Sequence, residues 1–245
     1  MSEQTGETRC KSCQSEITGD FCSACGHPKT LKRIDGNYIA SEIASVVNFE
    51  KGILFTIKEL LIRPGKNIET FIREDRSRLV KPLIFLIICS LAYTIAQQYL
   101  RFEDGYVAAG EMEDSAVLDL FAWVQQNYGY ANILMAVFVA LWIKLFFRKY
   151  QYNFFEILIL LCFVMGIGML IFTLFGVVEG LTKQSMLGLG GIFGFGYICF
   201  AIGNFFDKKR IMSYVKGLFA YLLGSITFFL LLIILGLVID QMSKA

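Results

Sequence analysis

Long apolar runs separated by short polar stretches are the main pattern along the 245-residue chain. Five of these runs are long enough, at about 1.5 Å per helical residue, to cross roughly 30 Å of hydrocarbon. They predict transmembrane helices at about 80–100, 130–147, 154–178, 186–206 and 217–239. The expected fold is therefore an all-α integral membrane protein with five transmembrane helices, whose membrane domain occupies residues 82–245.

Shorter amphipathic runs precede the first span. Apolar residues at helical spacing predict a helix over 38–48, and 52–62 is a second apolar run that is too short to cross a membrane. Lys58 and Glu59 within it favour a helix lying in the interface, and Pro64 suits the first position of a third helix. Residues 31–81 are therefore predicted to be a cytoplasmic connector of amphipathic helices.

Two charged segments flank the first span. Residues 73–78 mix basic and acidic side chains, and we expect a solvated face that anchors the span at lipid headgroups, with a protein-binding site as the alternative. The acidic loop 101–129 is expected to be solvated; Ca²⁺ binding is the alternative, which the lack of the regular alternation of a calcium-binding loop argues against. Its second half, 117–124, is predicted to form a helix on the outer surface of the membrane.

The distribution of basic residues predicts the orientation. Lys and Arg gather at 58–81, 144–149 and 208–216, whereas the opposite ends of the spans carry only Arg101, Lys183 and Lys244. The positive-inside rule then places the N-terminus in the cytoplasm and the C-terminus outside, in a bacterial inner membrane. The polar first 30 residues, which lack the apolar core of a signal peptide, agree with this orientation.

Net charge and hydropathy limit the classes of partner. The formal charge of +2 at pH 7 argues against a nucleic-acid partner, and 56% of the residues are hydrophobic. The lipid bilayer is therefore the first expected partner.

Four cysteines near the N-terminus form two Cys-x2-Cys pairs: Cys10 with Cys13, and Cys22 with Cys25. Four thiolates at this spacing are typical of a closed tetrahedral zinc site, so residues 1–30 are predicted to be a zinc-ribbon head with one structural Zn²⁺. Zinc that only folds a segment too small for its own core is favoured over a chemical role, and rubredoxin-type iron is the alternative. His27 is expected to be exposed, because Cys25 already supplies the fourth ligand.

Charged residues within the spans are few. Lys144 and Glu156 lie near the cytoplasmic ends of adjacent, antiparallel spans, and we expect an intramembrane charge pair between them. The alternative is that Lys144 snorkels independently to the headgroups. No charge falls at the centre of a span, which argues against a proton relay or a path for charged substrates.

Glycines form two small-xxx-small pairs: Gly190 with Gly194, and Gly176 with Gly180. Such pairs let helix backbones approach closely, so packing within the bundle or in a homo-oligomer is favoured over a pore lining.

The chain also resembles a known family. The motifs are the Cys-x2-Cys…Cys-x2-Cys-Gly head, the segment 49–65 that ends in Arg-Pro-Gly, a Phe71-Ile72…Arg76 element and the Lys81-Pro82-Leu83 entry to the first span. Over about residues 10–100 they are similar to an uncharacterised family of bacterial multi-span membrane proteins, a domain of unknown function. This resemblance implies an architecture and a membrane location, but no mechanism.

Three functions are compatible with these features. The leading hypothesis is a non-enzymatic membrane scaffold or sensor, whose zinc ribbon and connector engage a cytoplasmic protein partner. The second is a channel or transporter for a small neutral or lipidic molecule, favoured by the glycine-rich fourth span. A membrane enzyme is the weakest, since the spans contain no carboxylate pair or Ser/His set.

Overall fold

The computed structural model describes residues 9, 14–16, 19–25, 52–102 and 115–244. By its internal contacts the chain divides into two compact units, Met1–Val47 and Asn48–Ala245. The helix expected over 38–48 and most of the acidic loop lie outside the described residues, as do Cys10 and Cys13. Each unit is described here by itself.

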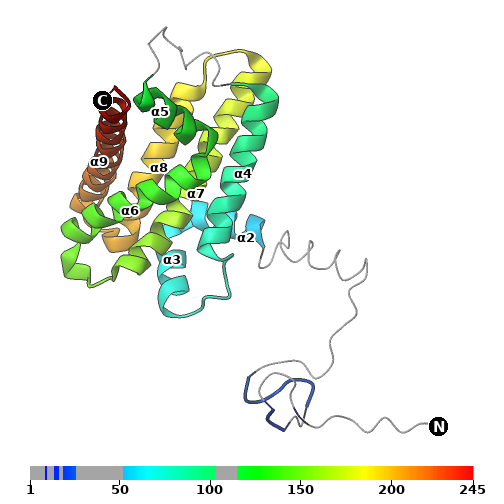
Figure 1. Ribbon diagram of the computed structural model, residues 1–245. Helices are drawn as coiled ribbons and strands as arrows, with labels where there is room; N and C mark the ends of the chain where they lie inside the picture. The colour runs from blue at the N-terminus through cyan, green and yellow to red at the C-terminus, as the bar shows by residue number, and fades with distance from the viewer. Residues whose placement is uncertain (1–8, 10–13, 17–18, 26–51, 103–114, 245) are drawn as a thin grey trace. The chain divides into compact units, whose positions relative to one another are not determined.

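The second unit is helical throughout its described part (Figure 1). Its helices are α2 (Ile53–Ile62), α3 (Pro64–Arg73), α4 (Pro82–Leu100), α5 (Ala116–Gln126), α6 (Tyr128–Phe146), α7 (Phe154–Thr182), α8 (Leu187–Asp207) and α9 (Ile211–Lys244). A single 3₁₀ turn, Arg148–Tyr150, lies between α6 and α7.

Four of these helices, α4, α7, α8 and α9, are long and apolar enough to cross a membrane. The neighbouring helices α5 and α6 meet at a bend of 100°, and they supply a fifth span if the bent pair is counted as one broken span. The structure thus agrees with a multi-pass membrane protein of four or five spans.

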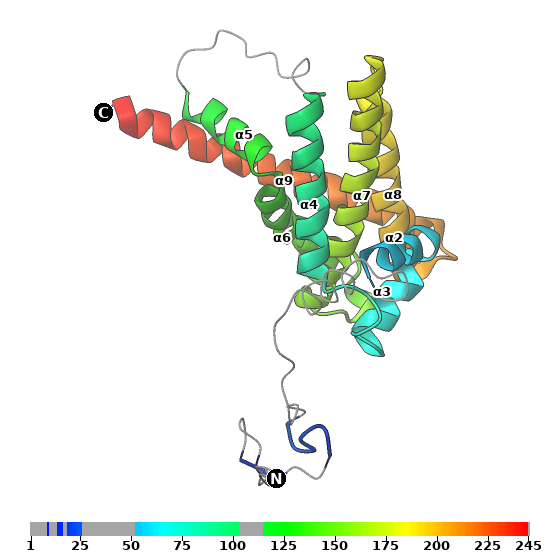
Figure 2. The same ribbon diagram turned by 90° about the vertical axis from the view of Figure 1, so that its right-hand side faces the viewer.

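The helix α7 forms the centre of the unit. In the most apolar 18-residue stretch of α7, 67% is buried inside the protein, compared with 22% in the corresponding stretch of α4 and 17% in that of α9. Figure 2 shows α4, α7 and α8 running side by side, whereas α9 is steeply inclined to them. Side chains at positions 157–169 are buried or half-buried on all sides of α7, and the helix sequence is a nearly continuous apolar run without a polar stripe.

The helix expected on the outer surface at 117–124 is present as α5, but it packs against α9. The Phe121 ring stacks on Phe229 with ring centres 5.9 Å apart. At the start of α5, the Asp240 carboxylate accepts hydrogen bonds from the Ser115 hydroxyl at 2.8 Å and the Ala116 amide at 2.7 Å. The predicted helix therefore exists, and contacts with α9 add to whatever the membrane surface contributes to its position.

The connector is also more deeply packed than the sequence suggests. Leu60 on α2 and Ile68 on α3 are fully buried, and Phe71 meets Phe163 of α7 edge to face at 5.3 Å. These residues belong to the same apolar core as α4, α7 and α8. The expected boundary between residues 81 and 82 therefore falls inside the second unit, because burying these apolar side chains stabilises the hairpin against the bundle.

Candidate functional site

The turn between α2 and α3, Arg63-Pro64-Gly65, is fitted against α8. A methyl group added at Gly65 would lie 2.5 Å from the backbone oxygen of Asn204, so only glycine allows this approach. The Gly65 amide donates a hydrogen bond of 3.2 Å to the Asn204 side-chain oxygen. Since the first amides of a helix have no partner within it, Asn204 acts as the cap of α3 from another helix.

Further hydrogen bonds are made at the C-terminal end of α2, next to this turn. The carbonyls of its last turn have few partners within the helix, although the Arg63 amide donates to that of Glu59 at 3.0 Å. The Asn67 amide donates to the Glu59 carbonyl at 2.8 Å, and the Tyr197 hydroxyl donates to the Leu60 carbonyl at 3.1 Å. These bonds tie α2 to α3 and to α8.

A third group of contacts joins the hairpin to the start of α4. The hydroxyl of Thr56, which is fully buried, accepts a hydrogen bond of 3.1 Å from the Val80 amide. Arg78 forms an ion pair with Glu59 at 2.9 Å, and this pair is only partly exposed. The hairpin of α2 and α3, residues 53–73, is thus bound to the bundle by both apolar packing and directed polar contacts.

Tyr152, in the turn before α7, contacts two side chains of α3. Its hydroxyl donates to the Glu69 carboxylate at 3.4 Å, and the Arg73 guanidinium lies 5.0 Å from the centre of its ring. Burial, assisted by the Glu69 charge, raises the pKa of Tyr152 above its ordinary value. The phenol therefore stays neutral and remains a hydrogen-bond donor.

The expected charge pair between Lys144 and Glu156 is not what the structure shows. The Lys144 ammonium donates to the Tyr152 carbonyl. The Glu156 carboxylate accepts from the Asn153 amide at 2.7 Å, and the Asn153 side chain accepts from the Glu156 amide at 2.8 Å. This capping box at the start of α7 gives the Glu156 carboxylate a hydrogen-bond donor within its own helix end, and Lys144 is not its partner. The Asn-x-x-Glu pattern was visible in the sequence.

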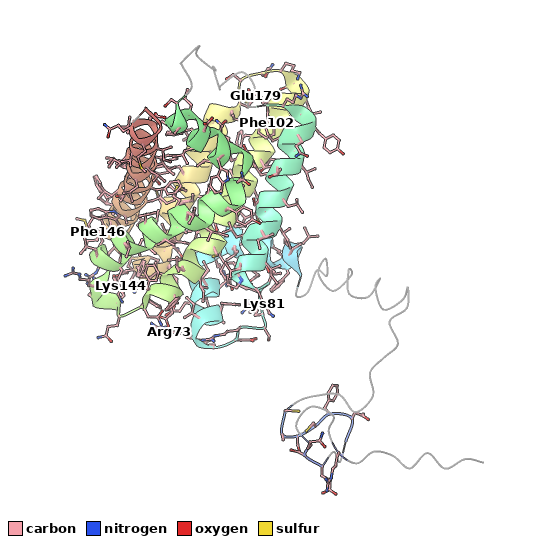
Figure 3. All side chains as sticks on the ribbon, viewed as in Figure 1. Arg73, Lys81, Phe102, Lys144, Phe146 and Glu179 are labelled. Carbon is pink, nitrogen blue, oxygen red and sulfur yellow. The ribbon has the colours of Figure 1, made fainter. Side chains whose placement is uncertain are left out.

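Two acidic side chains that the sequence analysis did not select cap neighbouring helices. Glu179, near the end of α7, accepts from the amides of Met186 and Leu187, both at 2.7 Å, and so caps α8. Asp240 caps α5 in the same way. Carboxylates are favourable at helix N-termini, where the helix dipole is positive. Figure 3 places Glu179 and Phe102 at one end of the unit, and Arg73 and Lys81 at the other.

All four selected glycines lie at helix contacts within this chain. A methyl group at Gly176 would lie 2.6 Å from the Phe102 ring, and one at Gly180 would lie 2.7 Å from Leu100. On α8, Gly190 approaches Phe175 and Gly194 approaches the backbone of Gly168. These contacts hold α7 against α4 and α8, in keeping with the packing role of small residues.

A cavity of about 190 Å³ lies among α4, α6, α7, α8 and α9. Its walls include Tyr93, Met169, Gly191 and Tyr221, and Asn132 of α6 supplies a side-chain amide. A second cavity of about 260 Å³ adjoins the bend between α5 and α6 and shares Asn132 and Tyr221 with the first. Within the described residues, no charged side chain lines either cavity.

In the N-terminal unit, Arg9 and Glu16 form an antiparallel bridge, and Gln14 has a φ of 63°. Gln14 directly follows the expected ligand Cys13, as Gly26 follows Cys25, and a positive φ there suits a Cys-x2-Cys knuckle. Cys22 is buried and Cys25 is exposed. The described residues contain no group of three or more potential metal ligands, and two of the four predicted ligands lie outside them, so zinc stays a prediction.

Comparison with known families adds one finding to this geometry. Residues 50–94 match the model of a family described as Protein of unknown function (DUF3667). No curated protein and no solved structure matches the chain. The DUF3667 match covers α2, α3 and most of α4, which are the hairpin and the helix that follows it.

The residues that hold the DUF3667 segment in place come partly from outside it. Tyr152, Tyr197 and Asn204 contact the hairpin from the turn before α7 and from α8. The candidate site is the contact between the hairpin of residues 53–73 and the rest of the bundle. The matched segment supplies one side of this contact, and the turn before α7 and the helix α8 supply the other.

Proposed function

We propose that this chain is a non-enzymatic membrane scaffold or sensor, whose zinc-ribbon head and connector engage a cytoplasmic protein partner. The observation that carries the proposal is the docked hairpin. Since α2 and α3 are bound to α7 and α8 by buried apolar side chains and capping hydrogen bonds, the segment that follows the head is attached to a rigid platform. A partner bound to the head would thereby be held at the membrane.

The orientation belongs to this proposal. Arg73 of α3 and Lys81, which directly precedes α4, lie at one end of the unit, and Glu179 lies at the other (Figure 3). The positive-inside rule supports placing the hairpin in the cytoplasm and the C-terminus outside a bacterial inner membrane.

Zinc is the second part of the proposal. The knuckle geometry at Gln14 fits a head in which Cys10, Cys13, Cys22 and Cys25 hold one structural ion. Such a head would fold only with metal, because a segment of this size has no apolar core of its own.

Affinity purification of the tagged full-length chain from cells, after cross-linking, tests this function. A partner should co-purify in near-equal amount with the wild type and with Cys199→Ser, which alters a cysteine of α8, but not with Cys22→Ser. If no protein reaches that amount, or if Cys22→Ser retains the partner, the scaffold function is refuted.

A transporter or channel for a small neutral or lipidic molecule is the second candidate function. It is favoured by the cavity of about 190 Å³ among α4, α6, α7, α8 and α9, which we call the central cavity. No charged side chain occurs in its described lining, which suits a neutral solute rather than an ion. Flux of a neutral solute into liposomes that contain the purified chain, with no flux in empty liposomes, would select this function over the scaffold. A homo-oligomer is compatible with both functions.

A further inference from the structure

The central cavity, of about 190 Å³, is lined by the side-chain amide of Asn132, whose hydrogen-bonding capacity the described residues use only in part. Asn132 Nδ2 lies 3.5 Å from the sulfur of Met169, and a thioether is a weak acceptor. Among the described residues, the structure gives the Asn132 carbonyl oxygen no hydrogen bond. An amide within a membrane bundle is costly unless its polar atoms find partners.

The depth of this amide follows from the broken span. Met169, Tyr93 and Gly194 lie near the middle of α7, α4 and α8, and all three line the same cavity as Asn132. The pair α5–α6 is bent by 100°, and Asn132, in the second turn of α6, lines the cavity beside these three residues. A broken span that brings polar groups to mid-membrane is typical of a binding site.

The glycines of α8 differ in whether close packing against α7 explains the lack of a side chain. Gly190 and Gly194 are in tight contact with α7, which explains why they have no side chain. Gly191 also lines the cavity, yet a methyl group there would meet no atom within 4 Å. Close packing therefore does not account for Gly191, and the cavity is open at this position; Gly188 and Gly196, which lie outside the lining, have open space as well.

The size and lining define the class of ligand. An engineered protein cavity of roughly 150 Å³ accommodates benzene, so a cavity of about 190 Å³ has room for one ring with a small substituent. Phe172, Phe195 and Met165 offer aromatic and thioether contacts, which suit a ring. No charged side chain in the described lining could balance a charged ligand.

We infer that this cavity binds a small neutral molecule with one ring and one hydroxyl group, such as a phenol, with the hydroxyl donating to the Asn132 carbonyl oxygen. The remainder of the molecule lies against the aromatic and methionine side chains. This site is independent of the scaffold function, because it requires neither the zinc head nor a protein partner.

Fluorine NMR of the full-length chain in detergent micelles tests the inference, with 4-fluorophenol as the probe and 4-fluorotoluene as its counterpart without a hydroxyl. Wild-type protein should broaden the 4-fluorophenol signal saturably, and unlabelled phenol should reverse the broadening. Broadening that grows without saturation would mean partition into micelles alone and would refute the site.

Two substitutions on α8 locate the probe. Gly191→Leu fills the open space and should weaken 4-fluorophenol binding by about tenfold or more, whereas Gly196→Leu, also at a position without neighbours but outside the lining, should leave it within about twofold. If Gly191→Leu does not fold, Gly191→Ala should give a smaller loss of the same sign. Equal effects at positions 191 and 196 would refute the location.

Asn132→Leu tests the role of the amide. Loss of one hydrogen bond should weaken 4-fluorophenol by about fivefold and leave 4-fluorotoluene within about twofold. Equal weakening of both probes, or no weakening of either, would refute the assigned hydrogen bond.

Discussion

Replacement of Gly65 by alanine is expected to loosen the hairpin from the bundle. The added methyl group would lie 2.5 Å from the Asn204 backbone oxygen and 2.5 Å from its side-chain oxygen. The backbone of α8 cannot move aside as a flexible side chain does, so α3 must shift instead. Overpacking of this kind costs about 1–3 kcal/mol.

Two further terms decide the net size of the effect. The shift lengthens the hydrogen bond from Gly65 to Asn204, whose loss costs about 1 kcal/mol. Alanine is the better helix former by about 1 kcal/mol, which offsets that loss. The expected net destabilisation is therefore about 1–3 kcal/mol, or a fall in melting temperature of about 2–12 °C for a unit of this size.

Thermal unfolding in detergent together with hydrogen exchange provides the assay. Exchange should increase in residues 53–73 while α9 keeps its protection, because the hairpin loosens as a local unit. Gly196→Ala is the matched control: it adds the same methyl group to a helix position that has no neighbour within 4 Å, and we expect unchanged or slightly higher stability. If Gly65→Ala melts with the wild type and residues 53–73 exchange no faster, then the contact with Asn204 does not hold the hairpin.

Three other predictions follow from the described contacts and from the predicted zinc head. Purified protein should contain one zinc ion per chain, and Cys22→Ser should release it without changing the melting of the helical unit; metal analysis that finds iron instead would contradict the assignment. In a double-mutant cycle with Lys144→Met and Glu156→Gln, the coupling energy should stay below about 0.5 kcal/mol, because each residue has a different partner; a larger value would indicate a pair after all. For Tyr152, the raised pKa means that the folded chain keeps the phenol proton at a pH where the unfolded chain releases it, so stability falls as pH rises above the ordinary value of 10.0. Tyr152→Phe should make this alkaline loss less steep in unfolding curves, and an unchanged slope would show that Tyr152 does not contribute to it.

The packing partners explain what the sequence leaves open about the hairpin. As an isolated stretch, 52–62 is an apolar run with a Lys-Glu pair, which suits an interfacial helix as well as a buried one. Leu60 and Thr56 become fully buried only because α7, α8 and the start of α4 come together around them. The same holds for α5, whose position depends on α9 more than 100 residues later in the chain.

The sequence by itself determined the helical class, the four helices long and apolar enough to cross a membrane and the Pro64 start of α3, because hydropathy and helix-start signals depend on consecutive residues. It also contained the capping box of Asn153 and Glu156, which removes the reason for a pair with Lys144. Only the tertiary structure decided which helix ends Asn204 and Asp240 cap and where Asn132 meets the cavity. A polar side chain near the end of a span satisfies whichever unpaired amides the packing brings to it, and that choice depends on residues far apart in the chain.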